Sequence, residues 1–289
     1  MNLTRPLISA PELRALLAAG QPVVLLDCGF DLTDAAAGER AYAAGHLPGA
    51  VYAHLDRDLS GDKSAGPAQG GRHPLPTREA FAATAGRWGV RPGVPVVAYD
   101  AQGGPYAARA WWLLRWLGHA DVAVLDGGPA AWQAEGGALS TEAGSRPEAQ
   151  PPYPAAAQPG MPTISAAELL QQAGGVRLFD ARAPERYRGE VEPLDAQAGH
   201  IPGARNRFFK DNLGADGRFK PAETLRAEWA ALIGRPGSEW GVVQQCGSGV
   251  TACHNLLAMA HAGLGESTLY PGCWSEWSAD PARPVARGS

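Results

Sequence analysis

The chain repeats itself, and this repeat constrains its fold more than any other feature of the sequence. Four landmarks return in the same order about 150 residues later. The repeated pairs are Ile8-Ser-Ala10 and Ile164-Ser-Ala166, Leu25-Leu-Asp27 and Leu178-Phe-Asp180, Gly45-His-Leu-Pro-Gly-Ala50 and Gly199-His-Ile-Pro-Gly-Ala204, and Val96-Val97 and Val242-Val243. Because 289 residues suffice for two domains of ordinary size, the sequence predicts two similar domains.

A proline-rich stretch separates the two copies. Residues Ala138 to Thr163 hold six prolines beside glycine, serine, alanine and glutamate. This composition cannot build a core and predicts an extended linker. We therefore expect a first domain over residues 1–137, a linker over 138–163 and a second domain over 164–289.

Within each half, short apolar segments alternate with helical segments, which is typical of a parallel sheet covered by helices on both faces. Helices are expected to start at Ser9 and Ser165, because a glutamate three residues later completes a capping box. Strands are expected at Val23–Leu26, Val94–Tyr99, Val122–Asp126, Val176–Phe179, Val242–Gln245 and Ser267–Tyr270. The class is α/β, in which ligands bind at the carboxyl edge of the sheet.

One expected strand-to-helix turn carries a cysteine among glycines, in the segment Cys246-Gly-Ser-Gly-Val-Thr-Ala-Cys253. Gly247 and Gly249 let the backbone curl, so that several N–H groups point at one spot beside the positive end of the following helix. A thiolate at Cys246 is stabilised there, and the thiolate is the reactive form of cysteine. The sequence therefore favours a nucleophile at Cys246 over a buried structural cysteine.

The same segment resembles the active-site loop of 3-mercaptopyruvate sulfurtransferases in the rhodanese superfamily. Gly199-His-Ile-Pro-Gly-Ala204 and Tyr270-Pro-Gly-Cys-Trp-Ser-Glu-Trp277 are similar to the two signatures of that superfamily. Cys273 stands where the pattern usually has glycine, serine or alanine, which leaves open a redox role for Cys273 or Cys253. The resemblance implies two tandem rhodanese-like domains, each a parallel sheet flanked by helices.

The alignment of the repeats implies that only the second domain is catalytic. Matching Val96-Val97 to Val242-Val243 puts Asp100 opposite Cys246. A carboxylate cannot carry sulfane sulfur, so the first domain is expected to be the non-catalytic partner. Three tryptophans follow Asp100 at helical spacing and are interpreted as core or inter-domain packing: Trp111, Trp112 and Trp116.

The resemblance also implies the chemistry. The Cys246 thiolate takes sulfur from 3-mercaptopyruvate, pyruvate leaves, and the resulting persulfide passes its sulfur to a thiol or cyanide, with thioredoxin as one candidate acceptor. Two half-reactions imply ping-pong kinetics. The N–H groups of the loop, formed by Gly247, Ser248, Gly249, Val250 and Thr251, are expected to stabilise the anion. No metal or organic cofactor is required.

The choice of sulfur donor rests on charge. The neutral Gly247 and Ser248 stand where thiosulfate enzymes carry basic residues, which favours an α-keto acid donor. Arg186 matches the carboxylate-binding arginine of the mercaptopyruvate family. The family's second such arginine is replaced by Leu194, so that Arg188 or Arg205 would have to substitute for it. Thiosulfate therefore remains the alternative donor.

An aspartate and a histidine of the first half approach the site in that family, and Asp56 and His73 are the candidates here. A relay between His73 and Ser248 would assist proton transfer to the departing enolate, whereas the alternative is a plain loop histidine. His46 and His200 occupy equivalent positions in the two halves, so a histidine is present there even in the half without the cysteine. We therefore interpret these two histidines as structural.

The remaining composition limits the partners. The formal net charge is −4 and basic residues are scattered, which argues against nucleic-acid and anionic-membrane partners. No apolar stretch is long enough to span a membrane, and the first six residues lack a signal-peptide hydrophobic region. The four cysteines show no zinc-like spacing, so a reducing, cytoplasmic location is expected.

Two other functions can be weighed against sulfur transfer. A phosphatase would need an arginine near the end of the loop, and Val250-Thr-Ala-Cys253 has none. A non-enzymatic persulfide carrier or sensor, holding sulfur for a dedicated partner, remains open on the sequence alone.

Overall fold

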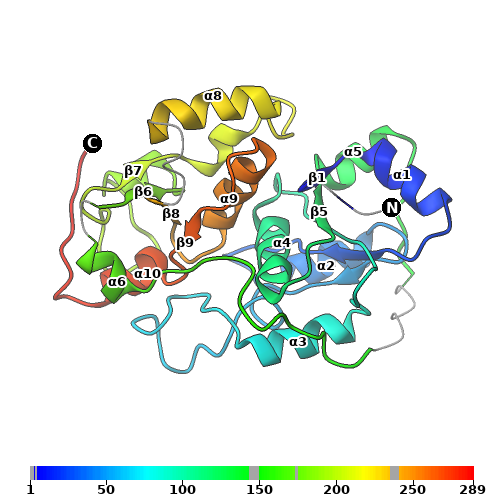
Figure 1. Cartoon of the computed structure of the whole chain (residues 1–289), viewed down its shortest axis with the longest axis horizontal. Coiled ribbons are helices and arrows are strands. Elements are labelled where there is room, and N and C mark those ends of the chain that lie inside the picture. The colour runs from blue at the N-terminus through cyan, green and yellow to red at the C-terminus, as the bar shows by residue number, and fades with distance from the viewer. Residues whose placement is uncertain (1–2, 4, 143–149, 173–174, 235–240) are drawn as a thin grey trace. The chain divides into compact units, whose positions relative to one another are not determined.

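The computed structural model describes residues 3, 5–142, 150–172, 175–234 and 241–289 (Figure 1). The chain divides into two compact units, and we describe each by itself. Unit 1 comprises Met1–Ser60, Pro76–Gly160 and Ala215–Phe219, whereas unit 2 comprises Gly61–Leu75, Met161–Gly214 and Lys220–Ser289. The segment Gly61–Leu75 thus belongs to unit 2, although it lies in the first half of the chain. Residues 143–149 of the expected linker, and residues 1, 2 and 4 near the N-terminus, lie outside the described residues.

Unit 1 holds a parallel sheet with the strand order β1-β5-β4-β2-β3 among its described residues. Its strands are β1 (Leu7–Ile8), β2 (Val24–Asp27), β3 (Val51–Tyr52), β4 (Val96–Tyr99) and β5 (Val122–Leu125). Its helices are α1 (Ala10–Ala18), α2 (Ala37–Ala44), α3 (Arg78–Arg87), α4 (Pro105–Leu117) and α5 (Gly128–Ala134). Every residue of β2, β4 and β5 is buried, so these strands are covered on both faces.

Unit 2 repeats this plan, with the parallel order β7-β6-β8-β9 among its described residues. Its strands are β6 (Arg177–Asp180), β7 (Arg205–Asn206), β8 (Val242–Gln245) and β9 (Thr268–Leu269). Its helices are α6 (Ala166–Gln171), α7 (Pro184–Tyr187), the 3₁₀-helix η1 (Phe209–Asn212), α8 (Ala222–Ile233), α9 (Thr251–His261) and α10 (Cys273–Ala279). A single bridge between Thr163 and Leu269 takes the place of β1. The predicted α/β class and the duplication are confirmed.

The same local contacts occur within each of the two units. Ser9 and Ser165 both cap their helices, and each serine N–H donates to the glutamate three residues on, at 2.9 and 2.8 Å. His46 and His200 each stack on a tyrosine with ring centroids 3.9 Å apart. The Nδ1 atom of each histidine lies 2.8 Å from the carbonyl oxygen of that same tyrosine. Identical contacts in both units support the structural interpretation of these histidines.

Three of the four two-residue strands among the described residues were not expected from the sequence, the exception being β9. The two-residue strands β1, β3 and β7 are too short to show an alternating pattern.

The three tryptophans of α4 are buried, with exposed fractions of 1, 0 and 8% for Trp111, Trp112 and Trp116. Their burial agrees with the expectation that they serve packing. No helix in the described ranges combines the length and the apolar character that crossing a membrane requires.

Candidate active site

Cys246 follows the last residue of β8 and precedes α9, at the carboxyl edge of the unit 2 sheet. Its side chain is 1% exposed. The N–H of Gly249 donates to Cys246 Sγ at 3.2 Å, and Gly249 has a φ of +80°, a conformation that glycine adopts without strain. The carbonyl oxygens of Cys246 and Gly247 accept from Trp274 N and Ser275 N, each at 2.9 Å. The start of α10 therefore holds the loop in place.

The sulfur of Cys246 is surrounded by hydrogen-bond donors. Burial by itself would raise the pKa of Cys246, but hydrogen bonds to the sulfur outweigh this effect and lower the pKa to about 5. The donors are the Cys273 thiol, the Thr251 hydroxyl and the backbone N–H groups of Ser248 and Ala252. Cys246 is therefore a thiolate at neutral pH, in the cradle that its flanking glycines predicted.

Cys273 lies directly beside Cys246. Its Sγ atom is 3.9 Å from Cys246 Sγ and accepts a hydrogen bond from Cys246 N at 3.0 Å. The carbonyl oxygen of Tyr270, 3.0 Å from Cys273 Sγ, is the alternative acceptor for its single thiol proton. Burial raises the pKa of Cys273 well above its ordinary value, and the neighbouring Cys246 sulfur raises it further. A protonated thiol thus stands next to a thiolate.

Unit 1 uses the same type of turn to hold a carboxylate. Asp100 follows β4, as Cys246 follows β8, and is 3% exposed. Its two oxygens accept from the backbone N–H groups of Gln102, Gly104, Tyr106 and Ala107 at 2.8 to 2.9 Å. Burial raises the pKa of Asp100, and these hydrogen bonds oppose that rise. In both units the turn is an anion cradle, filled by a carboxylate in one and a thiolate in the other.

The structure brings His73 and Ser248 together. The His73 Nδ1 atom lies 2.8 Å from Ser248 Oγ, and both residues are buried, with exposed fractions of 5 and 4%. Asp56, the other residue expected from the first half, lies in unit 1, where its N–H donates to His54 Nδ1 at 3.1 Å. Its participation in the chemistry remains a prediction.

The segment Gly61–Leu75 is docked on α10 through backbone contacts. Gly70 N donates to Glu276 Oε1 at 3.2 Å, and Arg72 N donates to Ser275 Oγ at 3.0 Å. Between them, Gly71 has a φ of +80°, and a Cβ atom there would lie 2.4 Å from the carbonyl oxygen of Gly272. Only glycine fits this position, which is how the segment brings residues 72 and 73 to the cysteine loop.

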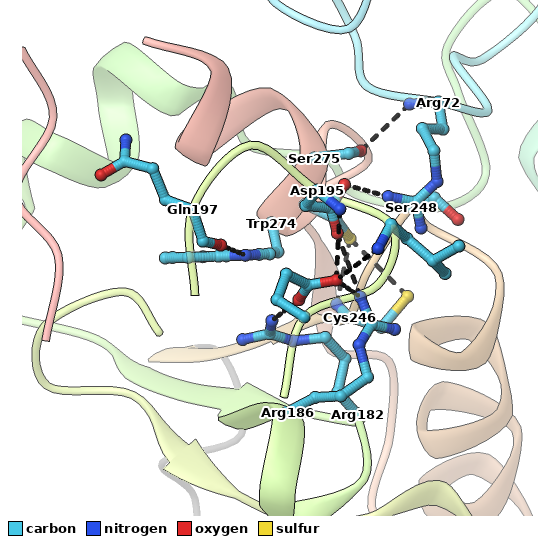
Figure 2. Close-up of polar contacts among 12 residues, drawn as sticks. Arg72, Arg182, Arg186, Asp195, Gln197, Cys246, Ser248, Trp274 and Ser275 are labelled. Atoms are coloured by element: carbon cyan, nitrogen blue, oxygen red, sulfur yellow. Dashed lines mark hydrogen bonds and ion pairs between the residues drawn. The ribbon is translucent and has the colours of Figure 1, made fainter. Parts of the chain in front are cut away.

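Two arginines meet at the cysteine loop, as Figure 2 shows. Arg186, which the sequence predicted, donates from Nη2 to Glu192 at 2.6 Å and to Asp195 at 3.1 Å. Arg72, which the sequence analysis missed, pairs through Nη1 with the other oxygen of Asp195. A Cβ atom at Gly247 would lie 3.1 Å from Arg72 Nη2 and 3.5 Å from Arg186 Nη1. Both guanidinium groups therefore border the residue that follows the nucleophile.

The two arginines that were expected to substitute for Leu194 have other partners. Arg188 pairs with Glu190 at 2.7 Å on the surface. Arg205 donates to the carbonyl oxygen of Leu232 at 3.0 Å. The sequence could not reveal Arg72 in their place, because nothing in its local pattern distinguishes it from any other loop arginine.

A buried ion-pair network supports this arrangement. Arg182, whose side chain is 1% exposed, bonds to Asp180 at 2.6 Å and reaches Glu192 at 3.3 Å. Its guanidinium carbon lies 4.7 Å from the ring centroid of Trp274. Glu192 in turn fixes Arg186. Arg186 is therefore held from two sides before any substrate arrives.

Comparison with known proteins agrees with this geometry. Residues 9–135 and 163–280 each match the family described as the Rhodanese-like domain. A protein of Pseudomonas aeruginosa, named as a probable 3-mercaptopyruvate sulfurtransferase, is 50% identical over 98% of both chains. A provisionally named thiosulfate sulfurtransferase of Mycobacterium tuberculosis is 44% identical, over 98% of this chain and 97% of its own. The solved structure of 3-mercaptopyruvate sulfurtransferase from Leishmania major superposes with a TM-score of 0.83 at 31% identity, covering 95% of this chain and 74% of that one.

Proposed function

Because this chain belongs to the rhodanese-like family of sulfurtransferases, we propose that it takes sulfur from 3-mercaptopyruvate onto Cys246 and passes it to a thiol or to cyanide. The observation that carries the proposal is the buried Cys246 sulfur, with the Gly249 N–H 3.2 Å away and a pKa lowered to about 5. Such a sulfur is both nucleophilic and a good acceptor of hydrogen bonds. It meets the requirements for carrying a second sulfur atom.

The first half-reaction uses the thiolate as nucleophile. Cys246 Sγ attacks the sulfur of the donor, the carbon–sulfur bond breaks, and its electron pair leaves with pyruvate as the enolate. Ser248 Oγ, 2.8 Å from His73 Nδ1, is the group through which a proton can reach that enolate. The cradle N–H groups of Ser248, Gly249 and Ala252 then stabilise the anionic persulfide.

The second half-reaction returns the enzyme to its starting form. A thiolate or cyanide attacks the outer sulfur of the persulfide, and Cys246 leaves as the thiolate. A low pKa makes Cys246 a good leaving group as well as a nucleophile at neutral pH. Thioredoxin and small cellular thiols are the acceptors we propose, and the four free cysteines, all within the described residues, are consistent with a reducing, cytoplasmic setting.

The charge of the site favours an α-keto acid over thiosulfate. Gly247 and Ser248 place no cation directly after Cys246, whereas Arg186 lies within reach of a carboxylate beside Gly247. The name of the Mycobacterium tuberculosis relative keeps thiosulfate as the second candidate donor. A persulfide carrier that serves one dedicated partner is the non-enzymatic alternative.

Steady-state kinetics separate these functions. We would measure kcat/KM for 3-mercaptopyruvate and for thiosulfate with cyanide as acceptor, and use Cys246→Ser as the control. We expect a ratio above about tenfold in favour of 3-mercaptopyruvate, or roughly 1.4 kcal/mol in transition-state binding. The reverse ratio would identify thiosulfate as the donor. Stoichiometric loading of sulfur without turnover would indicate the carrier.

The Cys246→Ser variant tests the nucleophile itself. A serine hydroxyl is too weakly acidic to replace the thiolate, so that sulfur transfer should disappear while the far-ultraviolet circular dichroism spectrum stays unchanged. Residual transfer above about a thousandth of the wild-type rate would rule out Cys246 as the sulfur-carrying residue.

A further inference from the structure

The cysteine loop is bordered by two cations from distant parts of the chain. Arg72 comes from the docked segment Gly61–Leu75 and Arg186 from α7. Their Nη2 and Nη1 atoms lie 3.1 and 3.5 Å from the position that a Cβ atom of Gly247 would occupy. Because Gly247 has no side chain, both guanidinium groups can lie this close to the backbone of the residue that follows Cys246. An anionic group bound by their remaining N–H groups would lie beside the cysteine loop.

Asp195 fixes the spacing of the two guanidinium groups. Each arginine binds a different oxygen of its carboxylate, and the Asp195 side chain is 2% exposed. Two cations held this close would repel each other without a shared counter-ion. Asp195 is therefore a positioning residue that holds Arg72 and Arg186 side by side.

Both arginines keep hydrogen-bonding capacity for a ligand. Their side chains are 23 and 18% exposed, so they are neither fully buried nor free in solvent. The Nε atom of Arg186 is buried and has no hydrogen-bond partner among the described residues. A buried donor without a partner is costly unless a ligand or water satisfies it. The pair is thus prepared to accept a planar anion with two oxygens.

We propose that Arg72 is the second carboxylate-binding residue of this active site and that, together with Arg186, it selects donors carrying an α-keto carboxylate. The inference rests on the proposed function. It explains how the chain dispenses with a cation at Leu194, whose apolar side chain is 40% exposed. A guanidinium group supplied by the docked segment replaces the one missing from the stretch that follows α7.

The same segment then supplies two functions to one substrate. Arg72 holds the carboxylate, and its neighbour His73 bonds to Ser248, through which the enolate is protonated. Backbone docking of Gly70 and Arg72 on Glu276 and Ser275 keeps the two side chains in register. A donor without the carboxylate loses the first contact, whereas Cys246 itself stays intact.

Alkylation of Cys246 tests the carboxylate site without any sulfur transfer. Iodoacetate and iodoacetamide react with the same thiolate, but only iodoacetate carries a carboxylate. We expect the iodoacetate-to-iodoacetamide rate ratio to fall about tenfold in Arg72→Gln, and the ratio corrects for any general change in the reactivity of Cys246. Arg72→Lys should restore part of the ratio, because it keeps the charge but loses the planar fork. Arg226→Gln, which removes an exposed arginine of α8, is the matched charge control.

Steady-state kinetics give the second readout. In Arg72→Gln the KM for 3-mercaptopyruvate should rise at least about tenfold, with a smaller change in kcat. An unchanged iodoacetate-to-iodoacetamide rate ratio in Arg72→Gln would overturn the proposal. A ratio that falls in Arg188→Gln and not in Arg72→Gln would also overturn it. If the wild-type protein does not turn over 3-mercaptopyruvate, the proposed function fails, but the alkylation ratio still decides whether Arg72 binds a carboxylate.

Discussion

At the residue scale, two opposing effects act on the sulfur of Cys246. Cys246 is 1% exposed, and this burial disfavours its thiolate form. Hydrogen bonds from Thr251, Cys273 and the loop N–H groups favour the thiolate. The effect of the hydrogen bonds is the larger one, and it lowers the pKa of Cys246 to about 5. The low pKa of Cys246 thus comes from its donors, and the two side-chain donors, Thr251 and Cys273, can be removed by substitution.

The pH dependence of alkylation should report this pKa directly. The rate constant for iodoacetamide at Cys246 should be flat above about pH 6.5 and fall tenfold per pH unit below about 5, since only the thiolate reacts. Because the folded-state pKa is depressed, the thiolate stabilises the fold above the ordinary cysteine pKa of about 8.5. That stability is lost as the pH falls through about 5. A kinetic midpoint near 8.5 would contradict the assignment.

Cys273 should account for part of the low pKa. Replacing it with alanine removes the neighbouring thiol donor, so the alkylation midpoint of Cys246 should rise by about one pH unit. Cys273→Ser retains a hydroxyl donor and should shift the midpoint less. Position 273 has a φ of +54°, and alanine and serine carry the same backbone strain there. Identical midpoints in the two variants and the wild type would remove Cys273 from the network.

At the element scale, the decisive feature is the docked segment Gly61–Leu75. Its glycines have different tasks, although their backbone conformations are similar. Gly66 and Gly71 have φ values of +76° and +80°. A Cβ atom would meet nothing within 4 Å at Gly66, but would lie 2.4 Å from the carbonyl oxygen of Gly272 at Gly71. The second glycine therefore sets the contact with α10.

This pair of glycines offers a matched experiment. Both alanine variants carry backbone strain of about 1–2 kcal/mol, but only Gly71→Ala pushes the segment away from α10. We expect kcat/KM for 3-mercaptopyruvate to fall at least about tenfold in Gly71→Ala, because Arg72 and His73 move. Gly66→Ala should stay within about twofold of the wild type. Equal losses in the two variants would mean that strain alone, and not docking, affects activity.

At this scale the sequence predicts regular elements better than contacts. The capping boxes at Ser9 and Ser165 correctly marked two helix starts, because a capping box is a local pattern. The place of Cys246 between a strand and a helix was predictable for the same reason, since its glycines and helix are adjacent in sequence. Arg72 was not, because it reaches Asp195 across 123 residues. Gly70 likewise meets Glu276 across 206 residues.

At the scale of the whole molecule, the same strand-to-helix turn occurs in both units and holds a different anionic side chain in each. Asp100 fills its cradle permanently, with four backbone N–H groups at 2.8 to 2.9 Å. Cys246 fills the equivalent cradle with a sulfur, which we propose is the reactive atom. The repeat made the fold and the two domains predictable from sequence. The assignment of Gly61–Leu75 to unit 2 was not predictable, because the repeat pattern places that segment in the first half.

This division of labour predicts separate effects on stability and chemistry. Asp100→Ala would leave three buried N–H donors, those of Gly104, Tyr106 and Ala107, without this acceptor and should lower the free energy of unfolding by roughly 2–4 kcal/mol. Urea denaturation measures that loss. The kcat per active site, counted by the burst of pyruvate, should remain within about twofold of the wild type. A fall in kcat without a fall in stability would assign unit 1 a direct part in the reaction.

The docked segment and α10 also determine when the site can form during synthesis. Arg72 and His73 are translated about 200 residues before Cys273, Trp274 and Ser275. Until those late residues leave the ribosome, Cys246 lacks a neighbouring donor and the support of α10. A half-made chain would therefore carry a Cys246 thiol with a higher pKa, which is less reactive toward oxidants and electrophiles. Its full reactivity begins only after the residues of α10 have been added.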